Sequence, residues 1–185
     1  MLVAVITGKK VVLRALERED LKLMHKWWND EEVMQWARSK PDNLAPMESL
    51  EKEFEQDLKG ENPHRRMLIV VEKRTGKAIG WASIRWWRLF STSADLGLVI
   101  AEKELRGRGF GTEATLLLAD MAFNQLNMHK VELFTRSDNK AAVSAVSKCG
   151  FKQEGILREE VYFNGKYHDG VLFGLLGDEY RARSL

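Results

Sequence analysis

The first half of the chain switches repeatedly between two spacings of apolar residues. Alternation of apolar and polar positions predicts strands, and apolar residues that recur every three to four positions predict helices. The strand pattern covers residues 10–16, 67–72 and 78–86, and the helical spacing covers residues 20–28, 30–37 and 47–59. The turn sequence Arg-Thr-Gly-Lys at residues 74–77 joins two of these strands, so we expect a hairpin there.

The second half places helices between strands. The strand pattern covers residues 94–100 and 130–135, and the helical spacing covers residues 114–123 and 141–148. Asn164-Gly165, between two runs rich in aromatic and branched residues, predicts a two-residue hairpin turn. Hairpins followed by strand–helix–strand units predict an α/β (α+β) fold with a mixed sheet and helices on both faces. With 185 residues, of which 44% are hydrophobic, we expect one domain, residues 1–185.

A glycine-rich segment connects the strand at 94–100 to the helix that follows. It reads Arg106-Gly107-Arg108-Gly109-Phe110-Gly111. Glycines let the backbone approach a polyanion, and a helix start presents unpaired N–H groups and a partial positive charge. No lysine follows Gly111, which excludes the usual P-loop, and Thr112 stands where the dinucleotide motif has its third glycine. We therefore expect a phosphate-binding loop of another kind.

The remaining pattern, Arg106-x-x-Gly109-x-Gly111, resembles the pyrophosphate-binding signature of the GCN5-related N-acetyltransferases (GNAT), which bind acetyl-CoA. A second block looks similar to the same family: Asn139 follows a strand, and Lys148-Cys149-Gly150-Phe151 ends the next helix. Residues 11–21, 28–33, 154–158 and 162–169 resemble the RimJ/RimL branch, the ribosomal-protein N-terminal acetyltransferases. The resemblance spans nearly the whole chain and implies the GNAT fold, with a mostly antiparallel sheet and a splayed parallel strand pair at the cofactor site.

The resemblance implies acetyl-CoA (coenzyme A) contacts in two blocks. The strand end and the loop supply Leu98, Val99, Ile100, Arg106, Gly107, Arg108, Gly109, Phe110, Gly111 and Thr112, and the second block supplies Asn139, Ala142 and Lys148. Two of these residues have an equally simple structural interpretation. Asn139 is a suitable helix N-cap, and Lys148 is a suitable solvated residue at a helix end.

Acetyl transfer to an amine needs a group that removes a proton, because a free alkyl amine has a pKa of about 10. Asp95 occupies the place where the family often carries a glutamate base, and His168 on the C-terminal hairpin is a second candidate. The alternative for Asp95 is a simple pair with an arginine. Val146 stands where many members carry a tyrosine that protonates the thiolate, so Ser147 is a stand-in acid or an ordinary surface serine.

We expect the acceptor cleft in the first half of the chain, where all six tryptophans lie. The candidate acceptor-binding residues are Trp28, Glu32, Trp86 and, on the hairpin, Tyr167. A tryptophan there can wall a pocket or stack on a cation, and an acidic residue can steer a cationic amine. The alternatives are core tryptophans and solvated acidic residues near a helix start.

Composition limits the partners. The net charge is +2, from 29 basic and 27 acidic residues, which does not favour nucleic acid as a partner. The single cysteine, Cys149, excludes an internal disulfide, and the four histidines do not cluster with carboxylates, so we expect no metal. The chain shows neither a secretion-signal pattern at its start nor an apolar run of membrane-spanning length, so we expect a cytoplasmic protein without a membrane partner.

The function expected from these observations is transfer of acetyl from acetyl-CoA to a primary amine, by direct attack in a ternary complex. The amine is a protein N-terminus, as the resemblance to the ribosomal-protein branch implies, or a small amine such as a polyamine. The sequence does not decide whether the protein forms a homodimer. The alternatives are an acyl-CoA-binding sensor of the same fold without catalysis, motivated by Val146, and a nucleotide-binding switch that uses the same loop.

Overall fold

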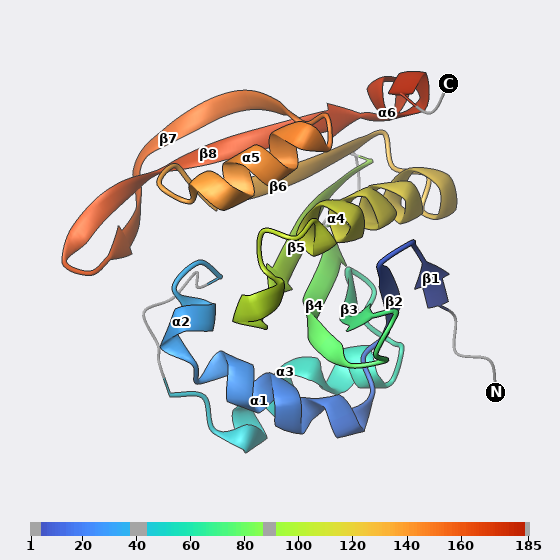
Figure 1. The fold of residues 1–185 in the computed structure, drawn as a ribbon, viewed down its shortest axis with the longest axis vertical. Coiled ribbons are helices and arrows are strands. Elements are labelled where there is room, and N and C mark those ends of the chain that lie inside the picture. Colours follow the sequence, from blue (N-terminus) through green and yellow to red (C-terminus); the bar gives the residue numbers. More distant parts are fainter. Residues whose placement is uncertain (1–4, 38–43, 87–91, 184–185) are drawn as a thin grey trace.

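The computed structural model describes residues 5–37, 44–86 and 92–183, and their strands form one eight-stranded sheet (Figure 1). In sheet order the strands are β1 (Val5–Thr7), β2 (Val11–Ala15), β3 (Arg65–Glu72), β4 (Ala78–Arg85), β5 (Ser93–Ile100), β6 (Lys130–Arg136), β8 (Lys166–Leu176) and β7 (Lys152–Phe163). Strands β5 and β6 are parallel, and the other neighbouring pairs are antiparallel. The expected mixed, mostly antiparallel sheet is confirmed.

Helices cover both faces of this sheet. They are α1 (Leu21–Trp28), α2 (Glu31–Met34), α3 (Met47–Leu58), α4 (Phe110–Asp120), α5 (Lys140–Lys148) and α6 (Gly177–Arg183), with the 3₁₀ turns η1 (Arg18–Asp20) and η2 (Lys103–Leu105) and the π-helical turn η3 (Met121–Gln125). Helix α4 begins at Phe110, four residues before the predicted start, because Gly109 acts as its N-cap. Helix α2 ends at Met34 rather than at residue 37, and β1 was not predicted.

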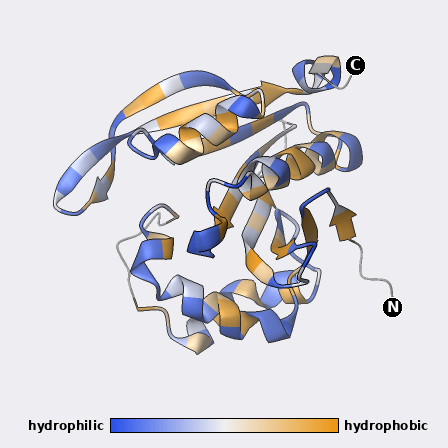
Figure 2. Cartoon of the chain, in the orientation of Figure 1, coloured by the Kyte–Doolittle hydropathy of each residue, from blue (hydrophilic) through white to orange (hydrophobic). Residues whose placement is uncertain are grey.

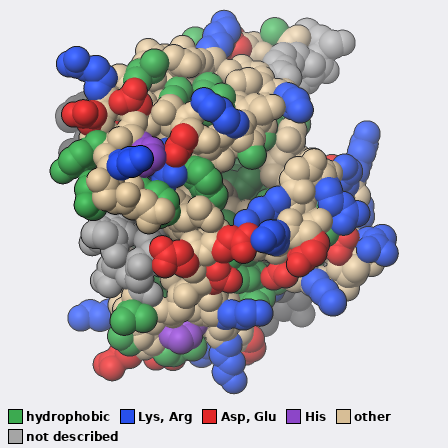
Figure 3. All heavy atoms as spheres, turned by 60° about the vertical axis from the view of Figure 1, so that its left-hand side comes forward, with side chains coloured by type: hydrophobic (Ala, Val, Ile, Leu, Met, Phe, Trp, Pro, Cys, Tyr) green, Lys and Arg blue, Asp and Glu red, His purple; other side chains and the backbone are tan. Residues whose placement is uncertain are grey.

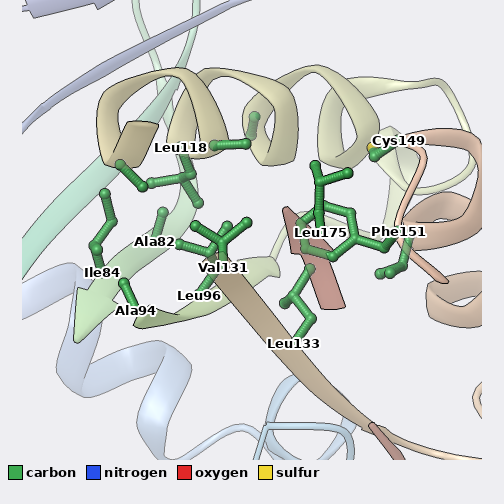
Figure 4. Packing of buried hydrophobic residues seen from close by; sticks show 14 of the residues in the cluster. Ala82, Ile84, Ala94, Leu96, Leu118, Val131, Leu133, Cys149, Phe151 and Leu175 are labelled. Atoms are coloured by element: carbon green, nitrogen blue, oxygen red, sulfur yellow. The ribbon is translucent and has the colours of Figure 1, made fainter. Parts of the chain in front are cut away.

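Two apolar clusters hold the helices to the sheet. On one face, α4 places Leu118 over Ala82, Leu96 and Val131 of the central strands, and these side chains are almost fully buried (Figure 4). On the other face, α1 and α3 pack against β3 and β4 through a second cluster that includes Trp27. Figure 2 shows that the tip of the β7–β8 hairpin is hydrophilic, whereas the central strands are hydrophobic. The sheet centre is therefore the rigid support of the site.

Strands β5 and β6 diverge in the middle of the sheet. They pair only from Ser93 to Asp95 on β5, with Lys130 to Glu132 on β6, and then continue apart to Ile100 and Arg136. Side chains alternate along a strand, so the two faces of the gap differ. Leu96, Leu98 and Ile100 pack into the cluster under α4, which puts Asp95 on the opposite face. The expected splay of a parallel strand pair is present.

Candidate active site

The glycine-rich loop lies at the open end of the β5–β6 splay and runs into α4. Gly107 and Gly109 have positive φ values of 73° and 87°, which side-chain-bearing residues rarely adopt. Among the described residues, Asp30 caps α2 and Asn139 caps α5, whereas α4, like α1 and α3, has no side-chain cap. The first N–H groups of a helix have no partner within the helix, so those of α4 remain available to a ligand. The loop is shaped to bind an anion.

A contact from the start of the chain supports this loop. The carboxylate of Glu113, in the first turn of α4, accepts hydrogen bonds from the backbone N–H groups of Lys9, Lys10 and Val11 at 2.9, 2.7 and 2.8 Å. The ammonium of Lys10 donates to the carbonyl oxygen of Arg108 at 2.9 Å. Sequence reasoning missed this support, because no local pattern relates residues about a hundred positions apart.

Arg106 and Arg108 differ in placement. The resemblance implies that both residues contact acetyl-CoA. The Arg106 guanidinium instead donates to the carbonyl oxygens of Ile100 and Ala101 at 3.0 and 2.9 Å and lies 3.5 Å from Glu32. Arg106 therefore secures the end of β5 to the loop, while Arg108 is exposed.

The gap between β5 and β6 suits an extended, amide-bearing chain. Beyond Asp95, the strands no longer exchange hydrogen bonds, and buried backbone groups need partners. An extended ligand that pairs with a strand edge supplies them. At the far side of the gap, Asn139 accepts a hydrogen bond from the N–H of Ala142 at 3.1 Å, so its interpretation as a helix cap is confirmed. Together, the uncapped helix and the open gap fit a phosphate group followed by a pantetheine arm.

Asp95 lies at the closed end of the splay and pairs with Arg85. Nε and Nη2 of Arg85 donate to Oδ1 of Asp95 at 3.0 and 2.5 Å. The arginine pair that was the alternative interpretation of Asp95 is therefore present, and both of these bonds end on the same carboxylate oxygen. The neighbouring carboxylate on β6, Glu132, accepts from Lys130 at 2.9 Å.

His168 and Ser147 are both engaged in contacts of their own. His168 Nδ1 lies 3.2 Å from Oδ2 of Asp138, and Nε2 lies 3.3 Å from the carbonyl oxygen of Phe163. The Ser147 hydroxyl donates to the carbonyl oxygen of Val143 at 2.9 Å within α5 and is exposed. Val146, at the position of the missing tyrosine, is buried. Because a valine side chain carries no acidic proton, residue 146 cannot protonate the thiolate.

The four expected acceptor residues are dispersed. The Trp28 ring is 4.5 Å from that of Trp81, so Trp28 belongs to the cluster under α1. Trp86 is half-buried under the guanidinium of an arginine on β3, and Tyr167 is exposed beside another tyrosine of the hairpin. Glu32 lies 3.0 Å from Nζ of Lys103. Of the four residues, Glu32 lines a cavity at the end of β5, and the other three do not.

That cavity has a volume of about 240 Å³ and lies between α1, α2 and η2. Its lining includes the carboxylates of Asp30, Glu32, Glu102 and Glu104, together with three basic side chains. The surface on this side of the molecule is hollowed and carries both acidic and basic side chains (Figure 3). The face of the splay opposite α4 therefore has carboxylates at its closed end, Asp95 and Glu132, and again at its open end.

No group of three or more potential metal ligands occurs in residues 5–37, 44–86 and 92–183. Within these ranges, no helix is both long enough and apolar enough to span a membrane.

A splayed parallel strand pair, an uncapped glycine-rich helix start and a gap for an extended arm define an acyl-CoA-dependent transferase. Comparison with known proteins agrees: residues 10–152 match the model of the acetyltransferase (GNAT) domain, and the chain belongs to this family. It is similar to the spermidine N(1)-acetyltransferase of Vibrio cholerae, with 32% identity over 96% of this chain and 99% of that protein. The crystal structure of that organism's spermidine N-acetyltransferase with CoA and spermine has a TM-score of 0.85 at 28% identity and covers 94% of this chain and 99% of that one.

The likeness to the ribosomal-protein branch is less extensive. A putative ribosomal N-acetyltransferase of Bacillus subtilis is 31% identical over 58% of each chain. The family and the relatives together establish that the chain is an acetyl-CoA-dependent N-acetyltransferase that acts on a primary amine.

Proposed function

We propose that the acceptor is a polyamine. The observation that carries this proposal is the set of carboxylates on the face opposite α4: Asp95 and Glu132 lie at the closed end of the splay, and four more carboxylates line a cavity of mixed charge at its open end. Carboxylates spaced along one face complement a chain with several ammonium groups, whereas a peptide N-terminus carries a single one. The Vibrio cholerae relatives, named for spermidine and crystallised with spermine, support the same acceptor class.

We further propose the roles of individual residues in a ternary complex. The loop from Gly107 to Gly111 and the start of α4 bind the phosphates, and the edge of β5 aligns the pantetheine arm. The cofactor supplies the activated acetyl group. Asp95 receives the proton of the attacking amine, directly or through water, because it is the carboxylate of β5 on the acceptor face. Solvent protonates the departing thiolate, since position 146 is a valine.

The acceptor class is tested by thiol release from acetyl-CoA with a panel of amines: spermidine, spermine, peptides with free N-termini, free amino acids and aminoglycosides. We expect release with spermidine and spermine at a kcat/KM at least tenfold above that for the peptides. A preference for peptides would overturn the polyamine proposal. Binding of acetyl-CoA without release for any amine would favour the sensor. A variant with a bulky residue at Gly109, whose φ is 87°, provides the blank.

The role of Asp95 is tested by Asp95→Asn, which keeps the shape and the capacity to accept from Arg85. A general base contributes about 10²–10⁴-fold to a rate, so we expect kcat to fall by about a hundredfold or more and the pH–rate profile to shift upward. Asp57→Asn is the matched control, because Asp57 on α3 forms a similar pair with Arg65 on β3. An unchanged pH profile in Asp95→Asn would move the role of general base to His168 or to water.

A further inference from the structure

A buried arginine joins three segments beside the open end of the splay. Arg136, the last residue of β6, is only 7% exposed. Its Nε and Nη2 donate to the two carboxylate oxygens of Asp138, each at 2.9 Å, and its Nη1 donates to the backbone carbonyl oxygen of Gln35 at 3.1 Å. One guanidinium therefore links the strand, the loop before α5 and the segment after α2.

Aromatic rings enclose the same guanidinium. Its central carbon lies 4.4 Å from the ring centre of Trp36 and 4.3 Å from that of Phe163 on the hairpin. The carboxylate of Asp138 also faces His168, and the hydrogen bonds from Arg136 hold the pKa of Asp138 below its ordinary value. A planar, delocalised cation fits two rings and a carboxylate fork, and lysine lacks this geometry. The site is therefore built for a guanidinium.

The segment held by Arg136 crosses the open end of the splay. We call residues 31–37, which comprise α2 and the turn after it, the α2 strap. Near its start, Glu32 pairs with Lys103 and Arg106, which follow β5. At its end, Gln35 and Trp36 contact Arg136 of β6. The strap is thus tied to both of the strands whose separation forms the gap, and Glu32 and Val33 of the strap line the cavity of about 240 Å³.

We propose that Arg136 is a positioning residue that holds the α2 strap across the splay and so fixes one wall of the amine-acceptor site. Arg136 acts through the strap and not on the reacting atoms. This inference rests on the proposed acceptor site, because it concerns the wall of that site. Loss of the link should affect the acceptor more than acetyl-CoA, since Glu113 holds the start of α4 and the hydrogen bonds of Arg106 hold the loop to β5 without the help of Arg136.

Arg65 provides a matched control within the chain. It donates to Asp57 and to the carbonyl oxygen of Glu53, and its guanidinium lies 5.1 Å from the ring centre of Phe54. Arg65 therefore makes the same kinds of contact and ties a helix, α3, to a strand, β3. Both α2 and α3 contribute to the second apolar cluster, and the difference is that α3 packs against β3 rather than beside the splay. Loss of either arginine affects stability, but only loss of Arg136 should affect the acceptor.

The first test is steady-state kinetics of Arg136→Ala, Arg136→Lys and Arg65→Ala with the best amine of the panel. For Arg136→Ala we expect the acceptor KM to rise about tenfold, while the acetyl-CoA KM stays within twofold and kcat within threefold. Arg136→Lys should show most of this rise, because lysine keeps the charge without the planar fork. Arg65→Ala should leave the acceptor KM unchanged. An equal acceptor KM for wild type and Arg136→Ala would overturn the proposal.

Two further measurements separate positioning from a general loss of fold. Methylguanidinium at millimolar concentration should lower the acceptor KM of Arg136→Ala towards the wild-type value, since it can occupy the vacated site between Trp36 and Phe163. It should not change Arg136→Lys. Amide hydrogen exchange in residues 31–37 should be faster in Arg136→Ala and slow down on addition of methylguanidinium. Exchange that is unaltered by the substitution would contradict the proposal even if the kinetics changed.

The exchange measurement also distinguishes a failure of this inference from a failure of the proposed function. If the wild-type enzyme rejects polyamines but accepts another amine, the polyamine proposal fails, and the kinetics are repeated with that amine. If no amine is accepted, faster exchange with methylguanidinium rescue supports the link between Arg136 and the strap, and its absence overturns it.

Discussion

The phosphate loop and the α2 strap lie on either side of the same splay but are built in opposite ways. The loop is a local structure, in which consecutive residues from Gly107 to Phe110 supply the left-handed turns and the helix start. The strap is held by contacts between distant residues, of which the bond from Arg136 to Gln35 spans 101 positions. A short motif therefore suffices to specify the proposed donor-binding loop, whereas the proposed acceptor wall depends on the folded sheet.

The glycine-rich loop also depends on a contact with a distant part of the chain, the hydrogen bonds of Glu113 to residues 9–11. Glu113 is local to the loop, but its three partners belong to the N-terminal hairpin, 102 to 104 positions away. The motif therefore fixes the shape of the loop, and the hydrogen bonds of Glu113 fix the position of the loop on the sheet.

Gly109→Val should abolish most of the acetyl-CoA affinity. Valine is strongly disfavoured at a φ of 87°, and its Cβ would lie 3.2 Å from the ammonium of Lys10. Strain of this kind costs about 1–3 kcal/mol, and the cradle also loses its shape, so we expect Kd to rise about a hundredfold, measured by calorimetry.

The control for Gly109→Val is Gly76→Val. Gly76 has a φ of 70° in the β3–β4 turn, and a Cβ added to it would meet no heavy atom of the described residues within 4 Å. This substitution should lower the melting temperature through backbone strain alone and leave acetyl-CoA affinity unchanged. Equal affinities of the two variants would show that the loop is not the phosphate site.

Glu113→Ala should have an intermediate effect. It removes the acceptor of three backbone N–H groups, and hydrogen bonds to a charged group contribute about 1.5–3 kcal/mol each when well shielded. Since the site is partly exposed, we expect about 2 kcal/mol less unfolding free energy in urea and an acetyl-CoA Kd about fivefold higher. Glu48→Ala, in the first turn of α3, controls for helix-terminal charge. An unchanged Kd would show that the hydrogen bonds of Glu113 contribute to stability but not to acetyl-CoA binding.

Asp138→Asn should have the smallest effect, and one that depends on pH. Because Arg136 lowers the pKa of Asp138 below its ordinary 3.8, the stabilisation is fully present above that value and is lost as the pH falls through the folded-state pKa. We expect a loss of about 1 kcal/mol near neutral pH, since Asp138 is 40% exposed. The difference from wild type should shrink below pH 3.8 in urea unfolding. A difference that is constant with pH would contradict the ion pair.

Much of the fold was predictable because its patterns are local. The predicted strands at 94–100 and 130–135 correspond to β5 and β6 within one residue at each end. The start of α4 was placed too late, because the glycines that make the loop are poor helix formers and conceal the first turn. Strand β1 was missed, since three residues carry too little periodicity, and its pairing with β2 forms it.

The family, the glycine-rich turn before α4 and the order of strands and helices could be predicted from the sequence, because glycine conformation, helix starts and apolar spacing act over a few residues. The sequence also indicated Asp95 and His168 as titratable groups. Their partners, Arg85 and Asp138, emerged from the folded structure, and the pairing of the sheet brought Arg136 to the strap. The reason is physical: a charge finds its partner through the packing of elements that are distant in sequence, and no local pattern encodes that distance.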